Sequence, residues 1–312
     1  MAQPGLLQPE PIVTDSKWIA GISSDQPVGE VARRVLGARL RAACRAIAPA
    51  ATKSDEDVEY VHRLRISVRR AMEALRLFSE WIDAAMLSGL RESLRTIRRA
   101  ADEARNWDVM CQRFAHGGGD GVVAKILRHV QDRRREAQGP VVAAYQELEA
   151  GGLADKIETL FQAIQSHDHD DEKRRFSRQA PRYLAPVIKK FFKAAESDLT
   201  AAESLHALRI RTKKLRYTME ILAVAFDSTF RKDLYCQVTL YQDLLGTIND
   251  HVTARKLFRD WLSKSDDAEE RAFLEGLVLA EDWSIEDLQA AFLVLWTPKV
   301  VSRLKRQFRA FC

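Results

Sequence analysis

Apolar residues recur at every third or fourth position along most of the chain, which is the spacing that places them on one face of an α-helix. The first clear stretch lies between Pro27 and Pro49, where the apolar positions are Val28, Val31, Val35, Leu36, Leu40 and Ile47. Alternation of apolar and polar residues over four to eight positions, the pattern of a half-buried strand, is convincing nowhere in the chain. The pattern therefore predicts an all-α protein.

Glycine, proline and capping residues divide this pattern into helices. We predict helices over residues 27–49, 55–81, 83–105, 122–149, around 157–161, and then over 176–195, 198–226, 231–245, 251–262, 269–279, 285–296 and from 298 onward. Pro140 is expected to interrupt the fourth helix, and the glycine run 117–119 to separate it from the third. Residues 1–25 show no periodicity and are predicted to form a flexible tail.

One basic pattern occurs twice. Residues 62–70 read HRLRISVRR and residues 206–214 read HALRIRTKK, so the second copy follows the first at an offset of 144 residues without a gap. The offset pairs His62 with His206, Arg65 with Arg209, Arg69 with Lys213 and Arg70 with Lys214. The same offset pairs Leu90 with Leu234 and Asn106 with Asp250. We therefore predict an internal duplication, with helical halves at about residues 26–166 and 171–312 of a single domain that starts at residue 26.

Each copy projects a histidine and two cations from one helix face, because positions i, i+3 and i+7 lie together. Like charges along one face weaken an isolated helix, so a chain that repeats them in one register is expected to use them to hold a polyanion. The net charge of +5 and the pI near 9.0 say little by themselves, since the clustering of charge is more informative than its sum.

The third predicted helix carries a further charged stripe. Its members are Arg91, Arg95, Arg98, Asp102 and Arg105. Arg95, Arg98 and Arg99 of this helix are added to the candidate anion-binding residues, because arginine donates two hydrogen bonds to phosphate oxygens. Arg133 and Arg134, on the next helix, are expected on an outer face away from the ligand.

The composition predicts a cytoplasmic protein by default. The N-terminal residues have neither the basic and apolar regions of a signal peptide nor the arginines of a transit peptide. No stretch approaches the roughly 18 apolar residues that a membrane span needs. The four cysteines form no CxxC pair and predict reduced thiols without a disulfide framework.

The two basic segments, each followed some way downstream by RNWDV (105–109) or LGTIND (245–250), resemble the CHAD family, the conserved histidine α-helical domain. This resemblance covers about residues 26–312. It implies two four-helix bundles related by a pseudo-twofold axis, a central channel lined by basic residues of the inner helices, and inorganic polyphosphate as the ligand. The residues implied to bind polyphosphate are His62, Arg65, Arg69, Arg70, His206, Arg209, Lys213, Lys214 and Arg216. Asp102 and Asn106 depart from the family's pattern, in which glycine is frequent and aspartate is usual at these two positions.

The two histidines allow three interpretations, which are hydrogen bonding to phosphate, a structural role, and metal ligation. Metal ligation is the least favoured, because Arg65 and Arg209 occupy the i+3 positions where a second ligand is needed, and cations repel a divalent metal. The segment HDHDD at 167–171 has residue types that ligate metals, but it is more typical of a solvated linker.

Enzyme motifs such as a Walker loop, GxSxG or HExxH do not occur in the sequence. Glu103, Asp108 and Asp250 could hold Mg²⁺ for phosphoryl transfer, although their place near a helix junction fits capping better. Trp107 and Tyr217 are too isolated to suggest base stacking. We therefore expect a protein that binds polyphosphate without catalysis, metal or other cofactor, and leave association with polyphosphate granules open. The alternatives are a metal-dependent phosphohydrolase that acts on phosphoanhydrides and a sequence-independent nucleic-acid binder.

Overall fold

The structure, a computed structural model, describes residues 16–114, 121–166 and 174–312. Within these ranges the chain is helical and contains no β-strand, apart from one isolated β-bridge between Pro27 and Arg175. The α-helices are α1 (Val28–Thr52), α2 (Glu59–Leu77), α3 (Ala84–Phe114), α4 (Val122–Ala150), α5 (Leu153–Ser166), α6 (Phe176–Ala195), α7 (Ala202–Leu222), α8 (Tyr235–Leu262), α9 (Ala268–Leu295) and α10 (Pro298–Arg309). The predicted all-α fold class is confirmed.

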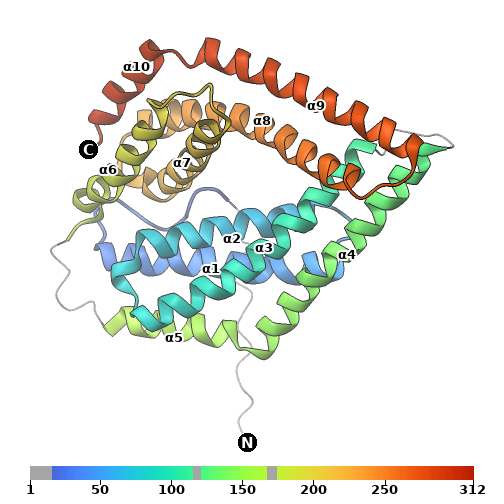
Figure 1. Cartoon of the computed structure of the whole chain (residues 1–312). Coiled ribbons are helices and arrows are strands. Elements are labelled where there is room, and N and C mark those ends of the chain that lie inside the picture. Colours follow the sequence, from blue (N-terminus) through green and yellow to red (C-terminus); the bar gives the residue numbers. More distant parts are fainter. Residues whose placement is uncertain (1–15, 115–120, 167–173) are drawn as a thin grey trace, which may run out of the picture.

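The helices form two groups that follow each other in the sequence. Figure 1 shows α1–α5 in the lower part of the molecule and α6–α10 in the upper part, and α2 packs against α7 where the two groups meet. The order of elements repeats near the 144-residue offset. Adding 144 to α2 gives 203–221, against 202–222 for α7, and adding it to the 3₁₀ turn Ser79–Trp81 gives the bounds of the second 3₁₀ turn, Ala223–Ala225. None of the helices in the described ranges is long and apolar enough to cross a membrane.

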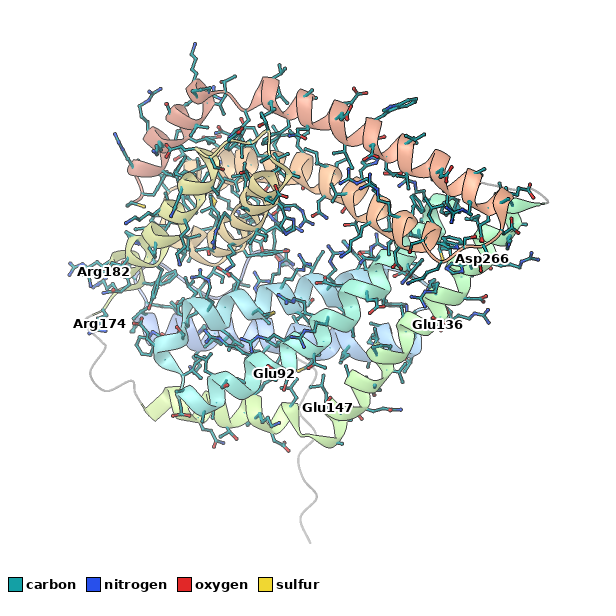
Figure 2. All side chains as sticks on the ribbon, viewed as in Figure 1. Glu92, Glu136, Glu147, Arg174, Arg182 and Asp266 are labelled. Atoms are coloured by element: carbon teal, nitrogen blue, oxygen red, sulfur yellow. The ribbon has the colours of Figure 1, made fainter. Side chains whose placement is uncertain are left out.

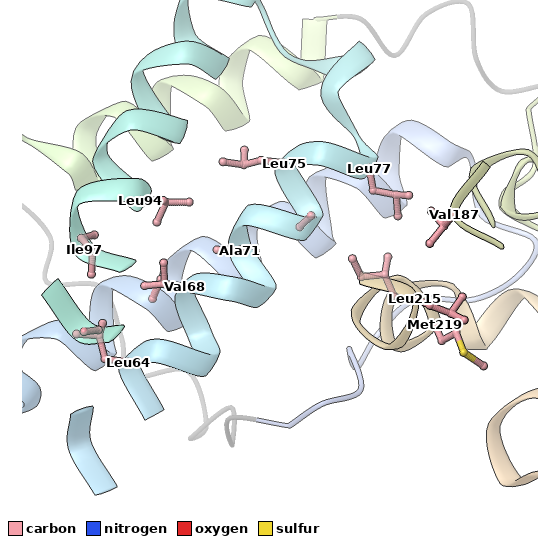
Figure 3. Packing of buried hydrophobic residues seen from close by; sticks show 14 of the residues in the cluster. Leu64, Val68, Ala71, Leu75, Leu77, Leu94, Ile97, Val187, Leu215 and Met219 are labelled. Atoms are coloured by element: carbon pink, nitrogen blue, oxygen red, sulfur yellow. The ribbon is translucent and has the colours of Figure 1, made fainter. Parts of the chain in front are cut away.

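The core explains why the basic side chains of α2 point away from the apolar interior. The opposite face of α2 carries Leu64, Val68, Ala71 and Leu75 at i, i+4, i+7 and i+11, and all four are fully buried. Figure 3 shows this row beside Leu94 and Ile97 of α3. Burying one such leucine contributes about 2 kcal/mol, so this stripe fixes the rotation of α2 about its axis.

A second apolar contact joins the two groups of helices. Leu77 of α2 lies near Val187 of α6 and Leu215 of α7 in Figure 3, and each of the three is buried. Because this contact holds the C-terminal part of α2 against α7, the polar face of α2 is presented to the polar face of α7.

Several predicted helix breaks are wrong. α8 is continuous through residues 246–250 and α9 through 280–284, α3 extends to Phe114, and Pro49 and Pro140 lie inside α1 and α4. A glycine such as Gly246 costs a helix about 1 kcal/mol, which is less than the burial of the neighbouring Leu245 and Ile248 contributes. The glycine run 117–119 and the segment 167–171 lie outside the described residues.

Residues 16–26, which we call the N-terminal strap, connect the two groups. Arg39 of α1 donates hydrogen bonds to the carbonyl oxygens of Ser16 (3.0 Å) and Lys17 (2.6 Å), and the ring of Trp18 lies 4.9 Å from that of Tyr235 in α8. Backbone hydrogen bonds also join Phe176 to Gln26 and Ser177 to Ser24. The predicted flexible tail, 1–25, therefore extends too far: residues 16–25 pack on the helices, and residues 1–15 lie outside the described part.

Candidate anion-binding site

Four cations from α2 and α7 form the centre of the candidate site. Arg65 and Arg69 lie four residues apart on α2, Arg209 and Lys213 lie four residues apart on α7, and all four side chains are partly or fully buried. We call these four residues the inner basic cluster. Figure 2 shows side chains that project into the space where α2 and α3 face α7 and α8, whereas labelled charges such as Arg174 and Arg182 lie at the edge of the molecule.

One carboxylate pairs directly with the inner basic cluster. Oδ1 of Asp102 in α3 lies 3.1 Å from Nε of Arg65 and 2.7 Å from Nη2 of Arg69, so one oxygen binds both arginines. Asp102 was recognised in the sequence as a departure from the family's pattern, and the structure shows that it partly neutralises the α2 side of the cluster. Its counterpart at the 144-residue offset is Gly246, so α7 has no equivalent partner.

The pKa values of the cluster show that the cations of the two helices act on one another. The pKa of Lys213 falls to about 6, because the amine is buried and because Arg209, Arg69 and Arg65 repel its proton, while Asp250 of α8 opposes the shift. Burial also lowers the pKa of Arg209 to about 10, although this arginine stays charged at neutral pH. Bringing these charges together has an electrostatic cost that an anion between the helices would remove.

Several buried donors around the cluster have no hydrogen-bond partner among the described residues. They are Nε of Arg69, Nε of Arg209, Nη1 of Arg105 and Nδ1 of His62. Buried polar groups are normally satisfied, so unpaired nitrogens on basic side chains in and beside the cluster are consistent with binding of an oxygen-rich anion.

The two histidines have different surroundings. His62 is half-buried, and its pKa is lowered by burial and by the nearby Arg105 and Arg65, against the opposing charge of Glu59. His206 is more exposed and lines a cavity of about 60 Å³ together with Arg209, Leu245, Ile248 and Asn249. His62 is therefore placed to donate a hydrogen bond near the cluster, and His206 lies at its edge.

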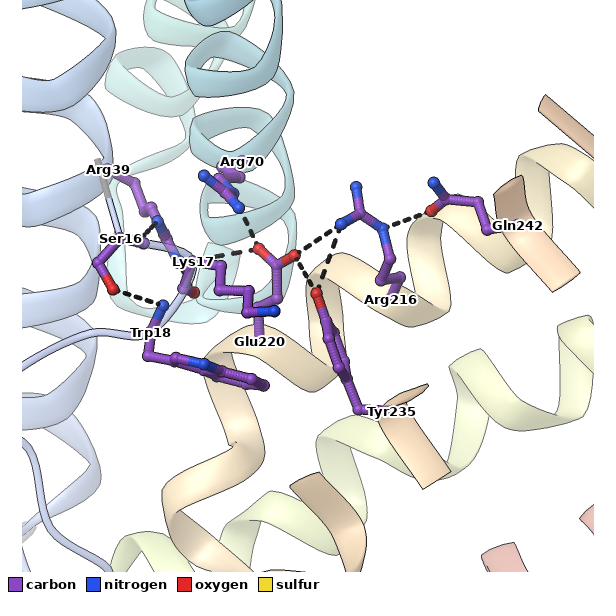
Figure 4. Close-up of polar contacts among 9 residues, drawn as sticks. All are labelled: Ser16, Lys17, Trp18, Arg39, Arg70, Arg216, Glu220, Tyr235 and Gln242. Atoms are coloured by element: carbon purple, nitrogen blue, oxygen red, sulfur yellow. Dashed lines mark hydrogen bonds and ion pairs between the residues drawn. The ribbon is translucent and has the colours of Figure 1, made fainter. Parts of the chain in front are cut away.

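Arg70 and Arg216 lie in a buried network instead of in the inner basic cluster. Both contact the fully buried carboxylate of Glu220, Arg70 through Nε (2.8 Å) and Arg216 through Nη1 (3.1 Å). Figure 4 shows the same carboxylate accepting a hydrogen bond from Tyr235 and lying near Arg39. The sequence pattern did not indicate this role, because Glu220 lies at the end of α7 and its partners other than Arg216 come from α1, α2 and α8.

The remaining candidates are spread over the surface around the cluster. Lys214 faces α6 and the end of α2 and does not join the other four cations. On α3, Arg95 is exposed and pairs with Glu92 in the preceding turn, Arg98 is half-buried, and Arg99 is exposed.

Arg134, which we expected on an outer face, is a structural residue. Its Nε lies 2.8 Å from Oδ1 of the fully buried Asp108, and its other nitrogens bind Asp55 (2.7 Å) and the carbonyl oxygen of Ser54 (2.6 Å). Arg134 therefore joins α4 to α3 through Asp108 and to the segment before α2 through Ser54 and Asp55. No group of three or more residues of ligating type that could hold a metal is found within the described ranges.

A family model described as the CHAD domain matches residues 34–259, which is most of the chain and includes both basic helices. The chain belongs to the CHAD family. The solved CHAD domain from the plant Ricinus communis has a similar fold, with a TM-score of 0.70 and 22% identity over 88% of this chain and 95% of that one. PptA from Streptomyces chartreusis is similar with a TM-score of 0.66 and 18% identity over 86% of this chain and 99% of that one. These identities support the CHAD fold alone, and no curated protein matches the chain.

Proposed function

We propose that this CHAD protein binds inorganic polyphosphate, without hydrolysing it, at the inner basic cluster between α2 and α7. The observation that carries the proposal is the meeting of Arg65, Arg69, Arg209 and Lys213 from two separate helices, with Asp102 as the one carboxylate bonded to them among the described residues. Membership of the CHAD family supports the same ligand, because the resemblance of the two basic segments to that family implied inorganic polyphosphate.

A chain of phosphates suits this arrangement better than a single phosphate. Residues four apart on a helix are separated by about 6 Å along its axis, so each helix offers its cations as a row. The ligand also competes with the carboxylate of Asp102 for Arg65 and Arg69. An anion that contacts both helices at once forms enough interactions to displace the Asp102 carboxylate. A single phosphate would only replace that carboxylate at the two arginines, with little net gain in binding free energy.

Nucleic acid fits the same charges less well. Tyr217, which lies close enough to Arg65 to affect its pKa, is covered by the guanidinium of Arg216 at 4.6 Å from the ring centroid. Trp107 is likewise covered by Arg133, at 5.4 Å. Single-stranded nucleic acids are held largely by bases stacked on free aromatic faces, which neither ring offers.

Charge reversal tests the proposed site. Replacing Arg65 and Arg69 by Glu, or Arg209 and Lys213 by Glu, is expected to reduce polyphosphate affinity at least about 100-fold, because attraction between buried charges becomes repulsion. The matched control is Arg128→Glu with Arg135→Glu on α4, where both side chains are exposed. Arg134 of the same helix is unsuitable as a control, because its loss would disturb the fold.

Calorimetry supplies the measurement. Long polyphosphate, pyrophosphate and single-stranded DNA are titrated at matched phosphate concentration, and we expect the tightest binding for long polyphosphate. Equal losses in the control and the cluster variants would indicate a diffuse charged surface, and a preference for DNA would favour the nucleic-acid alternative.

A further inference from the structure

A second group of cations lies on the other side of α7. Arg211 and Lys214 of α7, Arg76 of α2 and Lys190 of α6 line a cavity of about 50 Å³, whose remaining walls are Pro186 and Val187. We call this the α6–α7 basic pocket. It shares none of its lining residues with the inner basic cluster.

The pocket has more cations than counter-ions. Arg76 binds Glu73 through Nε at 2.9 Å, and Thr218 donates a hydrogen bond to the same carboxylate at 2.7 Å. The side chains of Lys190, Arg211 and Lys214 form no hydrogen bond or ion pair with any residue that the structure describes. Four cations therefore share one carboxylate.

At the 144-residue offset, the position equivalent to Glu220 is occupied by a cation, Arg76. The ion pair between Arg70 and Glu220 has, as its counterpart in that register, Lys214 (70 + 144) and Arg76 (220 − 144). One side of the α2–α7 contact is thus neutralised by Glu220, and the corresponding side brings two cations together. This arrangement destabilises the ligand-free protein, and a protein that retains it gains when an external anion binds.

The chemistry of the pocket limits what that anion can be. A cavity of about 50 Å³ is several times larger than the ~10–15 Å³ that one water needs, and cations form most of its lining. Burial and the charges of Arg211, Arg76 and Lys190 lower the pKa of Lys214, against the pull of Glu73, and a dianion would reverse this effect. Arginine and lysine together are the usual donors to phosphoryl oxygens.

We infer that the α6–α7 basic pocket binds a phosphoryl group, either of a small phosphate such as pyrophosphate or at the end of a polyphosphate chain. This inference does not depend on binding at the inner basic cluster, because the two sites use different side chains. It gives α7 two anion-binding faces, one toward α2 and one toward α6.

The test is calorimetry of the full chain with pyrophosphate at low ionic strength. The pocket variant is Lys190→Ala with Arg211→Ala and Lys214→Ala, and the control variant is Arg182→Ala with Lys189→Ala and Lys193→Ala, three exposed cations of α6 that lie outside the cavity lining. Both variants lose three positive charges. We expect pyrophosphate affinity to fall at least about tenfold in the pocket variant and by less than about twofold in the control.

Equal losses in the two variants, or an undiminished affinity in the pocket variant, would overturn the inference. The three replaced side chains form no ion pairs, so the fold should persist, and circular dichroism checks this. The single variant Arg211→Ala, read by the loss of ³¹P line broadening for bound pyrophosphate, tests the same site if the triple variant unfolds.

Long polyphosphate distinguishes the two sources of the phosphoryl group. If the pocket takes the end of a chain, the pocket variant weakens long-chain binding as well; if it takes a separate small phosphate, long-chain affinity is unchanged. An Arg65→Gln, Arg209→Gln variant keeps the pocket intact. Pyrophosphate binding that survives in this variant would support the pocket. If the unaltered protein binds pyrophosphate but not long polyphosphate, the proposed function is rejected and the pocket is not.

Discussion

At the residue scale, Asp102 determines how strongly the α2 side of the inner basic cluster attracts an anion. Its Oδ1 binds both Arg65 and Arg69, and a phosphate must share or displace it. The cluster therefore contains its own competitor, which limits affinity and keeps the two arginines ordered before the ligand arrives.

Replacing Asp102 by Asn should therefore strengthen polyphosphate binding and weaken the ligand-free fold. We expect a roughly three- to tenfold gain in affinity and a loss of about 1 kcal/mol in the free energy of unfolding, the size of a partly exposed ion pair. Calorimetry and thermal unfolding measure the two quantities. Asp243→Asn, at an exposed site of α8, is the control, and a weaker affinity in Asp102→Asn would show that Asp102 positions the arginines more than it competes.

Lys213 makes both stability and binding depend on pH. Its pKa is about 6 in the folded protein and 10.5 in an ordinary environment, so the unfolded chain binds more protons between these values. The stability of the ligand-free protein should therefore rise with pH across this window and fall as the pH drops toward 6. Polyphosphate stabilises the charged amine, so binding takes up a proton and affinity should increase as the pH falls from about 9 to about 6.

Titration in two buffers of different ionisation enthalpy measures this proton uptake, and Lys213→Met should abolish most of it. His62→Gln should leave the dependence above pH 7 intact, since His62 is neutral there. Observed enthalpies that are the same in both buffers would contradict a neutral Lys213 in the free protein.

The charge of each residue was predictable from the sequence, but its partner was not. The family resemblance, and not the register alone, led us to expect Arg65, Arg69, Arg209 and Lys213 at one site, and in the structure the three arginines lie close enough to lower the pKa of Lys213. Arg70 belongs to the same pattern but is bound to Glu220, because the direction of a helix face does not reveal which carboxylate a distant turn of another helix will bring to it.

At the element scale, apolar periodicity predicted the helices well and their ends poorly. The faces of α2 and α7 follow from the spacing of leucines such as Leu64 and Leu208, which are fully buried. α8 and α9 were each predicted as two helices, since Gly246 and the charged stretch 280–284 suggested breaks. Glu281 explains the second case: it is fully buried in α9 and bonded to Arg113 and His251, so a polar residue at that position belongs to a packed interior.

The attachment of α4 depends on Arg134. Replacing Arg134 by Ala should lower the free energy of unfolding by about 3–5 kcal/mol, because the carboxylate of Asp108 is fully buried and would lose its cation. Burial already raises the pKa of Asp108, so the remaining carboxyl group would become protonated more easily. Denaturant unfolding measures the loss.

Adding Asp108→Asn to Arg134→Ala should recover part of the lost stability, since the uncompensated charge is then removed. Polyphosphate affinity, measured well below the unfolding temperature, should change little in either variant. A large loss of affinity would mean that α4 contributes directly to the ligand site.

At the scale of the whole molecule, the proposed function requires the two groups of helices to bind one ligand together. If a phosphate chain engages all four cations of the inner basic cluster, the logarithm of affinity should fall linearly with the logarithm of salt concentration. Each neutralised phosphate contributes ~0.7 to the magnitude of the slope, so four contacts give a slope of about −3. Neutralising one helix, with Arg209→Gln and Lys213→Gln, should bring the slope to about half. An affinity that is flat in salt would contradict the electrostatic account.

The proposed function also requires that the protein does not cleave the chain. A phosphohydrolase needs a metal to neutralise developing charge and a base to orient water. Incubation with Mg²⁺ or Mn²⁺ for hours should leave polyphosphate intact, and EDTA should leave binding unchanged. Phosphate release that disappears in Asp250→Ala would support the phosphohydrolase alternative, whereas Asp108→Ala would disturb the contact with Arg134 and is not used.

The N-terminal strap shows that the recognisable domain and the stable unit have different limits. The family model begins at residue 34 and ends at 259, yet Trp18 lies against Tyr235 of α8, and Ser16 and Lys17 accept the hydrogen bonds of Arg39. A protein trimmed to the matched range would expose the guanidinium of Arg39 and one side of Tyr235, and it would lose α9 with its buried Glu281. Weak binding by such a fragment would then reflect a less stable fold and not a missing ligand contact. Any search for the smallest binding unit therefore has to begin upstream of Ser16.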